Sequence, residues 1–248
     1  RYSDLNPKKW RLLRVEDQLN IKKIERQPNK LGHVADIRVG IATCKDSVYF
    51  VKGTTLKEGF YQKEYKGKPY HIESNIVKPI AKISDFENQE DLEKNSRMII
   101  FPYIVTGGSV SVIPEKDLKN KYPECYEYLL AAKDELETRD KGKGEYPTWY
   151  SYARTQGLNF AGKKLLTPTF SNRPRFIFDD KEEMLFCNGY GIYEKKALQL
   201  ALSQNINLKT LSKILNSKVM EYYITKTSFT IEGGYPCYQK NFIELFGI

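Results

Sequence analysis

YPECYEYLLAAKDELETRD, residues 122–140, decides the fold class, because it places a helix between two series of strand-like segments. Pro123 and Glu124 are typical of a first helical turn. Apolar and aromatic side chains then recur every three or four residues, which predicts a helix with one buried face. This core stripe consists of Tyr122, Tyr126, Leu129, Ala132 and Leu136.

The segments before this helix have the pattern of strands. Between residues 33 and 113 the chain contains short runs rich in β-branched and aromatic residues, separated by Gly, Pro, Asn and Lys. They predict a meandering, largely antiparallel sheet or a small barrel, followed by a short helix that begins at Pro114–Glu115. The runs are VADIRVGIAT, SVYFVKG, GFYQKEY, KPYHIE, NIVKPIAKI, RMIIFPYIV and SVSVI.

The two ends of the chain complete a mixed pattern. KKLLTPTF, RFIFDD and YGIY predict short strands, whereas residues 8–26 and 208–227 each predict a helix with one apolar face. The fold class is therefore α+β, with mainly antiparallel strands and with helices in the middle and at the C-terminal end. The apolar positions are Leu12, Val15 and Leu19 in the first helix, and Leu208, Leu211, Leu215, Val219 and Tyr222 in the last.

The charge balance favours an anionic partner. The chain has 40 Lys and Arg residues against 31 Asp and Glu residues, a net charge of +9. Nucleic acid is the commonest partner of such a chain, and solubility alone is the competing explanation. No apolar run approaches the ~18 residues of a membrane span and no signal peptide opens the chain, so we expect a cytoplasmic protein without a membrane partner.

The cysteines and histidines give little material for metal chemistry. None of the cysteines forms a C-x-x-C pair, so we expect buried thiols and no zinc site. With only two histidines, His33 and His71, a histidine-based metal site is also not expected. The cysteines are Cys44, Cys125, Cys187 and Cys237.

Motifs of the common enzyme classes are absent. The sequence lacks a phosphate-binding P-loop, a G-x-G-x-x-G turn and a G-x-S-x-G nucleophile motif. Asp179, Glu194 and Lys196 are the best match to a Mg²⁺-dependent nuclease, and with charged residues at 29% of the chain such a match also arises by chance. We predict no catalytic residue in this chain, with the nuclease as an alternative.

Several segments follow one another in a specific order. GIAT at residues 40–43 is followed by NIVKPIAKISDF, MIIFPYIV and the Tyr-Pro helix of residues 122–140. WYSYARTQ, KKLLTPTF, FIFDD, NGYGIY, LSKILNSKVMEYYI and GGYPCYQKNFIELF then complete the series. In this order they resemble the TaqI-like C-terminal specificity domain, the target-recognition domain of adenine-specific DNA methyltransferases and of fused restriction–modification enzymes. Cys44 departs from the pattern, because the family usually has a second glycine in this turn.

The resemblance implies a module that reads DNA for a neighbouring domain. It implies a target-recognition fold over residues 31–248, with residues 1–30 as a connector helix from an N-terminal catalytic domain. Residue 1 is Arg, so we expect the chain to be a piece of a longer protein. The catalytic domain would bind S-adenosylmethionine and carry an Asn-Pro-Pro-aromatic motif, so this chain itself needs no cofactor. The expected parent is a type II, IIG-like enzyme, and the alternative is the specificity domain of a multi-subunit type I system.

The stretch 138–175 has the composition that sequence reading on DNA requires, with cations for phosphates and polar side chains for base edges. We predict phosphate contacts from Arg139, Lys141, Lys143, Lys163 and Lys164, and base contacts from Arg154, Gln156, Asn172 and Arg173. Trp149 and Tyr150 are assigned to stacking on DNA or to the core, and Arg38 and Thr43 to DNA contact from the first strand and turn. A structural ion pair is the competing role for Arg154, and a solvated strand edge is the competing role for Lys163.

Overall fold

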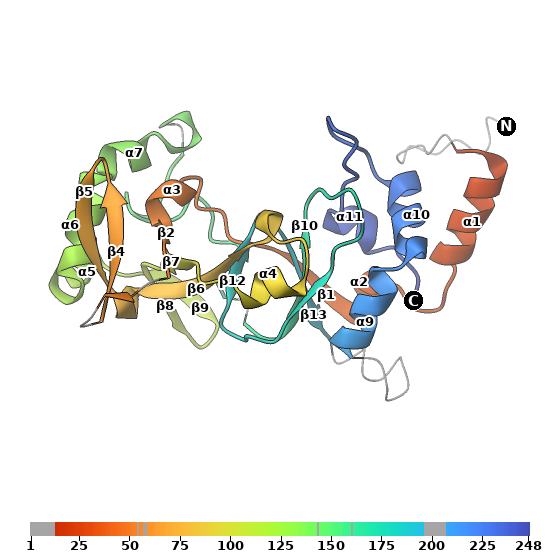
Figure 1. The fold of residues 1–248 in the computed structure, drawn as a ribbon, viewed down its shortest axis with the longest axis horizontal. Coiled ribbons are helices and arrows are strands. Elements are labelled where there is room, and N and C mark those ends of the chain that lie inside the picture. The colour runs from red at the N-terminus through yellow and green to blue at the C-terminus, as the bar shows by residue number, and fades with distance from the viewer. Residues whose placement is uncertain (1–12, 54, 57–58, 143, 160, 196–206) are drawn as a thin grey trace. The chain divides into compact units, whose positions relative to one another are not determined.

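The computed structural model describes residues 13–53, 55–56, 59–142, 144–159, 161–195 and 207–248 (Figure 1). The chain divides into two compact units that interleave along the sequence. Unit 1 comprises residues 1–38, 164–178 and 189–248, and unit 2 comprises residues 39–163 and 179–188. Residues 31–248, predicted as one recognition domain, therefore contribute to both units.

Unit 1 is built on a four-stranded sheet with the order β1-β13-β10-β11. Its strands are β1 (Ala35–Val39), β10 (Lys164–Pro168), β11 (Ile177–Asp179) and β13 (Gly189–Glu194). Strand β10 pairs antiparallel with β13, from Lys164 opposite Tyr193 to Pro168 opposite Gly189. All of β10 is buried, so this strand belongs to the interior of unit 1.

The helices of unit 1 are α1 (Val15–Glu25), α2 (Leu31–Val34), α9 (Leu208–Leu215), α10 (Lys218–Thr227) and α11 (Lys240–Ile243). They share one hydrophobic core with the sheet, in which Leu165, Phe176, Leu211 and Tyr223 are buried. Burial of this apolar surface supplies the main stabilisation of the unit.

The C-terminal helix prediction was right in type and wrong in continuity. The first helix ends at Asn216, whose side chain accepts a hydrogen bond from the Phe176 N–H at 2.9 Å. Ser217 then caps the N-terminus of a second helix. The break shifts the phase of the apolar face. Val219 is therefore 52% exposed, whereas Met220 and Ile224 are buried.

Helix α1 packs on α10 through a different face from the one predicted. Val15 and Leu19 are exposed, and Ile21 is the residue that is buried. Polar contacts hold the two helices together: Asp17 accepts hydrogen bonds from the Tyr222 hydroxyl at 2.6 Å and from Lys226 Nζ at 2.9 Å. The segment predicted as a connector is thus an integral part of unit 1 from residue 15 onward, and Leu12 lies outside the described residues.

The described residues of unit 2 form three sheets, with the orders β12-β6-β7-β2, β3-β4-β5 and β8-β9. Strand β12 pairs with β6 in parallel, and the β6–β7, β2–β7, β3–β4, β4–β5 and β8–β9 pairs are antiparallel. This arrangement confirms the predicted α+β class with mainly antiparallel strands. The strands are β2 (Phe50–Val51), β3 (Thr55–Leu56), β4 (Phe60–Tyr65), β5 (Lys68–Glu73), β6 (Val77–Lys82), β7 (Met98–Ile100), β8 (Tyr103–Thr106), β9 (Ser109–Val112) and β12 (Leu185–Cys187).

The stretch 122–140 forms two consecutive helices, α6 (Pro123–Ala131) and α7 (Lys133–Glu137). Leu129, Ala132 and Leu136 of the predicted stripe are fully buried, while Tyr122 and Tyr126 are only partly buried. The N-terminus of α6 is capped from β5, because the Glu73 carboxylate accepts hydrogen bonds from the N–H groups of residues 124 and 125, both at 2.9 Å. The other helical segments are α3 (Asp46–Tyr49), α4 (Gln89–Glu93), α5 (Glu115–Lys121), η2 (Ser74–Ile76), η3 (Ile83–Asp85) and η4 (Arg139–Gly142).

One predicted strand of unit 2 is wrong in its first half. SVYFVKG begins inside helix α3, and only Phe50 and Val51 are in a strand. The Thr43 hydroxyl accepts a hydrogen bond from the Lys45 N–H at 3.1 Å and donates one to Asp46 Oδ1 at 2.5 Å. These two hydrogen bonds form a turn that leads into α3, although β-branched and aromatic residues follow.

Within the described part of the chain, every helix is too short or too polar to cross a bilayer.

Candidate nucleic-acid interface

The chain enters unit 2 through a tightly packed segment, residues 39–42. The Ile41 N–H donates to the Phe186 carbonyl oxygen at 2.9 Å. A Cβ at Gly40 would lie 2.5 Å from the same oxygen, and a Cβ at Gly157 would lie 2.8 Å from the Val39 oxygen. Glycine is therefore required at both positions for the backbones to approach this closely.

The turn after this segment contains a residue in the left-handed region. Cys44 has φ of 57° and is exposed, which shows that a cysteine adopts here the conformation that favours glycine. The prediction that all four cysteines are buried is thus wrong for Cys44, whereas Cys125, Cys187 and Cys237 are buried. Thr43 is 1% exposed and its hydroxyl hydrogen-bonds to the Lys45 N–H and to Asp46, so burial gives it a structural role and removes it from the proposed contact set.

Arg139 is buried, contrary to the expectation of a phosphate contact. Its side chain is 1% exposed, and its guanidinium donates to the carbonyl oxygens of Leu136 at 2.6 Å, Trp149 at 2.7 Å and Ser151. It also lies 4.2 Å from the Tyr146 ring centroid. Because a buried guanidinium must be paired, these carbonyls satisfy it, and the residue acts inside the fold.

A second exposed turn follows Arg139 directly. Asp140, Lys141 and Gly142 have φ values of 47°, 59° and 72°, so three consecutive residues adopt the left-handed conformation. The Tyr146 hydroxyl donates to Asp140 Oδ2 at 2.8 Å, which fixes the turn. Lys141 points to solvent, and Lys143 lies outside the described residues. Left-handed non-glycine residues concentrate at functional sites, where the surrounding structure stabilises them.

The aromatic cluster of residues 149–152 belongs mainly to the core. Tyr150 is fully buried and its hydroxyl donates to the Ile113 carbonyl at 2.6 Å. Of the two predicted roles, DNA stacking and core packing, Tyr150 therefore has the core role. Tyr152 is 1% exposed and packs edge-on against Tyr49, with ring centroids 4.8 Å apart. Trp149 is partly buried, and its Nε1 donates to Glu115 Oε1 at 3.1 Å. These rings support the surface segment that follows them.

Arg154 lies on that surface segment. Its backbone N–H donates to the Ala42 carbonyl at 3.1 Å in an isolated antiparallel bridge, and its side chain is exposed. Partial desolvation of the largely exposed Cys44 thiol raises its pKa, Asp140 raises it further, and Arg154 lowers it. The bridge sets Arg154 opposite Ala42, two residues before Cys44, and the charges of Asp140 and Arg154 both act on the Cys44 thiol. Gln156 and Lys163, later in the same region, are also exposed.

The remaining predicted contacts belong to unit 1. Asn172 and Arg173 are exposed between β10 and β11, in a segment held by the Ser171 N–H, which donates to the Pro236 carbonyl at 3.2 Å. Arg38 forms an ion pair with Asp36 at 3.6 Å and remains partly exposed. Lys164 is fully buried, 6.0 Å from the Tyr193 ring centroid, so it too leaves the proposed contact set.

Unit 2 thus brings together Arg154 and the turns at Cys44 and Lys141. We name the exposed and half-buried cations of this region, Lys45, Lys141 and Arg154, the basic turn surface. Lys45 was missed in the sequence analysis, although its position directly after the family's turn was a usable signal. A basic patch of this kind attracts phosphates, and an arginine can donate two hydrogen bonds to a guanine edge.

The residues of the alternative nuclease are distributed over the chain. Asp179, the last residue of β11, is 1% exposed and accepts a hydrogen bond from the Lys181 N–H at 3.0 Å. Glu194 is the last residue of β13 in the same sheet and is exposed, and Lys196 lies outside the described residues. Among the residues that the structure describes, no three His, Cys, Asp or Glu side chains gather as a metal site would require.

Comparison with known proteins identifies relatives of one kind. The TaqI-like C-terminal specificity domain family matches residues 115–248, more than half of the chain. The type II restriction enzyme and methyltransferase RM.Eco57I of Escherichia coli is 26% identical over 235 residues, which cover 89% of this chain and 23% of the relative. The type II methyltransferase M.PaeR7I of Pseudomonas aeruginosa is 23% identical over 175 residues, 70% of this chain and 27% of the relative. The chain therefore spans about a quarter of the length of these relatives.

Proposed function

Because the chain belongs to the family of TaqI-like C-terminal specificity domains, we propose that it binds double-stranded DNA and recognises one short base sequence. The observation that supports this function best is the position of Arg154. Its backbone is fixed to Ala42, while its guanidinium is exposed beside the turns at Cys44 and Lys141. A rigid backbone with a free guanidinium is what a bidentate contact to guanine requires.

The exposed residues divide into two kinds of contact. Lys141 and Lys163 neutralise phosphates, which supplies salt-dependent affinity without selecting a sequence. Arg154 and Gln156 read base edges in the major groove. From unit 1, Asn172, Arg173 and Arg38 add further base or phosphate contacts, and the partly buried Trp149 supports the surface from within.

We further propose that recognition serves methylation in a longer polypeptide. The relatives named as methyltransferases are about four times as long as the matched region. In this proposal, an S-adenosylmethionine-dependent domain of the same IIG-like chain methylates the amino group of an adenine, and this chain positions the DNA. DNA from the host would then carry N6-methyladenine at the sequence that the chain selects. Methylation-sensitive sequencing tests this, and an unmethylated site would contradict it.

Selection from a random duplex library tests DNA recognition itself. The 248-residue chain is expected to enrich one short sequence, and log affinity is expected to fall linearly with log salt concentration. Enrichment of no sequence, or an affinity that does not depend on salt, would overturn the proposal. A duplex with the selected site scrambled is the matched control for the affinity measurement.

A further inference from the structure

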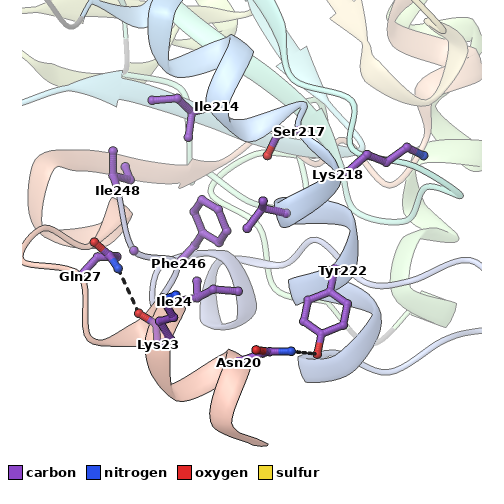
Figure 2. Close-up of a pocket in the computed structure, with 12 residues that line it drawn as sticks. Asn20, Lys23, Ile24, Gln27, Ile214, Ser217, Lys218, Tyr222, Phe246 and Ile248 are labelled. Carbon is purple, nitrogen blue, oxygen red and sulfur yellow. Dashed lines mark hydrogen bonds between the residues drawn. The ribbon is translucent and has the colours of Figure 1, made fainter. Parts of the chain in front are cut away.

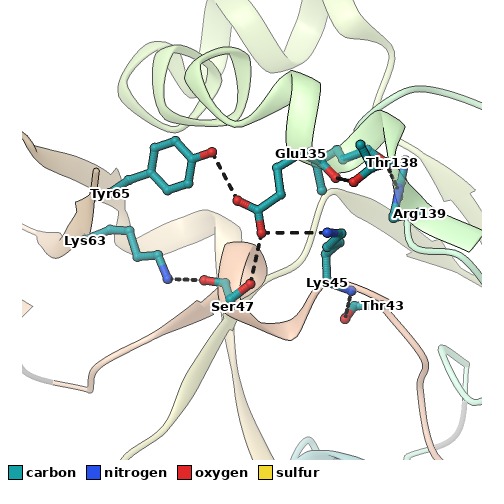
Figure 3. A network of polar contacts seen from close by, with 9 residues as sticks. Thr43, Lys45, Ser47, Lys63, Tyr65, Glu135, Thr138 and Arg139 are labelled. Carbon is teal, nitrogen blue, oxygen red and sulfur yellow. Dashed lines mark hydrogen bonds and ion pairs between the residues drawn. The ribbon is translucent and has the colours of Figure 1, made fainter. Parts of the chain in front are cut away.

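Glu135 of helix α7 forms the centre of a polar network (Figure 3). Its carboxylate accepts hydrogen bonds from the Ser47 hydroxyl at 3.3 Å and the Tyr65 hydroxyl at 3.1 Å. Lys45 Nζ lies 3.9 Å from Glu135 Oε1. One carboxylate thus joins helix α3, strand β4 and the cation that follows the Cys44 turn.

Lys63 of β4 holds helix α3 through two backbone carbonyl oxygens. Its Nζ donates to the carbonyl oxygens of Ser47 at 2.6 Å and Phe50 at 2.5 Å. Ser47 belongs to α3 and Phe50 is its C-cap residue, and a helix of only four residues has little stability of its own. Burial lowers the pKa of Lys63, and the nearby Glu135 charge opposes this shift. Tertiary contacts, rather than local propensity, hold α3 in place.

Arg139 performs the equivalent task for the segment that carries Arg154. Its guanidinium binds the carbonyls of Trp149 and Ser151, and the Tyr49 hydroxyl donates to the Ser151 carbonyl at 3.1 Å. Three residues after Ser151, the Arg154 side chain emerges at the surface. A buried cation therefore fixes the base of the segment that presents an exposed one.

Both anchors arise from one short stretch of chain. Glu135 and Arg139 are separated by a single helical turn that ends at Thr138, whose hydroxyl donates to the Glu135 carbonyl at 2.8 Å. The left-handed turn with Lys141 follows immediately. Glu135 and Arg139 thus contact Lys45 and the segment that carries Arg154, and Lys141 lies two residues after Arg139 in the chain.

We propose that Glu135 and Arg139 are positioning residues for sequence recognition: they hold Lys45, Lys141 and Arg154 in one fixed arrangement before DNA arrives. The inference rests on the proposed function and goes beyond it by assigning the source of specificity to two residues that do not touch DNA. Groups that are ordered in advance lose less conformational freedom on binding, and they reject sequences that do not fit.

The test compares four variants of the 248-residue chain on the selected duplex and on a scrambled duplex. Glu135→Ala and Arg139→Lys remove the anchors, and Arg139→Lys keeps the charge. Glu137→Ala is the control for the first, because Glu137 lies on the same helix, is exposed and forms an ion pair with Lys133 at 3.9 Å. Arg97→Lys is the control for the second, because Arg97 is an arginine of unit 2 whose ion pair, with Asp85 at 2.9 Å, involves neither Glu135 nor Arg139.

For both anchor variants the ratio of selected to scrambled affinity is expected to fall about tenfold, the loss of roughly one good base contact. Affinity for the scrambled duplex and the salt slope are expected to stay within about twofold, because the number of phosphate contacts is unchanged. Backbone hydrogen exchange is expected to accelerate in residues 43–49 and 149–154. Both controls are expected to behave as the unmodified chain.

An unchanged affinity ratio in the folded Glu135→Ala variant, whatever Arg139→Lys does, would overturn the inference and leave DNA recognition intact. An equal loss on both duplexes would overturn it as well, because it would reduce the network to a general stabilising role. If the unmodified chain itself shows no sequence preference, the proposed function fails first and the inference falls with it.

Discussion

The backbone N–H of Arg154 donates to the carbonyl oxygen of Ala42 at 3.1 Å, so two segments far apart in the sequence form one surface. If Arg154 reads a guanine, Arg154→Ala is expected to cost roughly 1–3 kcal/mol on the selected duplex and to relax specificity at one base pair. Lys94→Ala is the control, because Lys94 is exposed in unit 2 and pairs with Glu90 on α4. Equal losses on selected and scrambled duplexes would show that Arg154 contacts only phosphate.

Lys141→Ala is expected to weaken binding to every duplex by a similar factor. Removal of one phosphate contact reduces the slope of log affinity against log salt by about one unit. Titrations at several salt concentrations measure this slope. The same change in slope from Lys94→Ala would mean that the effect follows net charge rather than the position of Lys141.

Gly157→Ala is expected to destabilise unit 2 more than Gly67→Ala. Both glycines have positive φ, 82° and 75°, so both substitutions carry the cost of left-handed backbone. Only the Cβ at residue 157 meets other backbone atoms, 2.8 Å from the Val39 oxygen, while nothing lies within 4 Å at residue 67. We expect a difference of about 1–3 kcal/mol in the free energy of unfolding, measured by denaturant titration. If both substitutions lowered the free energy of unfolding equally, the backbone of residues 39–42 would be able to move away from the added Cβ at little cost.

Cys44→Gly is expected to raise the free energy of unfolding by up to about 1 kcal/mol, because glycine adopts φ of 57° without a steric cost. Cys44→Ala keeps the β-carbon and should bring no such gain. Denaturant titration of both variants separates relief of backbone strain from loss of the thiol. A gain of equal size in Cys44→Ala would assign the effect to the thiol.

The buried Cys187 thiol should make stability depend on alkaline pH. Burial, with a smaller effect of Asp46, raises its pKa from 9.0 to about 12. The unfolded thiol therefore ionises first, so this contribution is complete below about pH 9 and is lost as pH rises toward about 12. In Cys187→Ala the contribution is absent, so the stability difference between the two proteins should shrink above about pH 9. A constant difference from pH 7 to 10 would contradict the prediction.

A pocket in unit 1 lies between α1, α10 and the C-terminal residues (Figure 2). Its volume is about 810 Å³, and Ile24, Ile214 and Phe246 contribute apolar side chains to its lining. The exposed Val219 also lines it, as a result of the phase shift at Asn216. Residues 208–227 were predicted as one continuous helix, and the apolar pattern of that helix predicted Val219 in the core.

The spacing of apolar residues along the chain predicted most helices and strands of the fold. It predicted for few polar side chains whether they are buried or exposed. The stripe of residues 122–140 was right for Leu129, Ala132 and Leu136, because a helical period depends on neighbouring residues alone. Arg139 continues the same stretch, yet nothing local distinguishes a solvent-facing arginine from one that binds the carbonyls of Trp149 and Ser151.

The sequence by itself determined the α+β class, the family and a cationic region around residues 138–175, because these depend on composition, period and order along the chain. Only the tertiary structure decided which cations face solvent: Lys141 and Arg154 are exposed, whereas Arg139 and Lys164 are buried. The physical reason is that burial of a charge depends on partners from distant segments, and a one-dimensional pattern does not contain those distances.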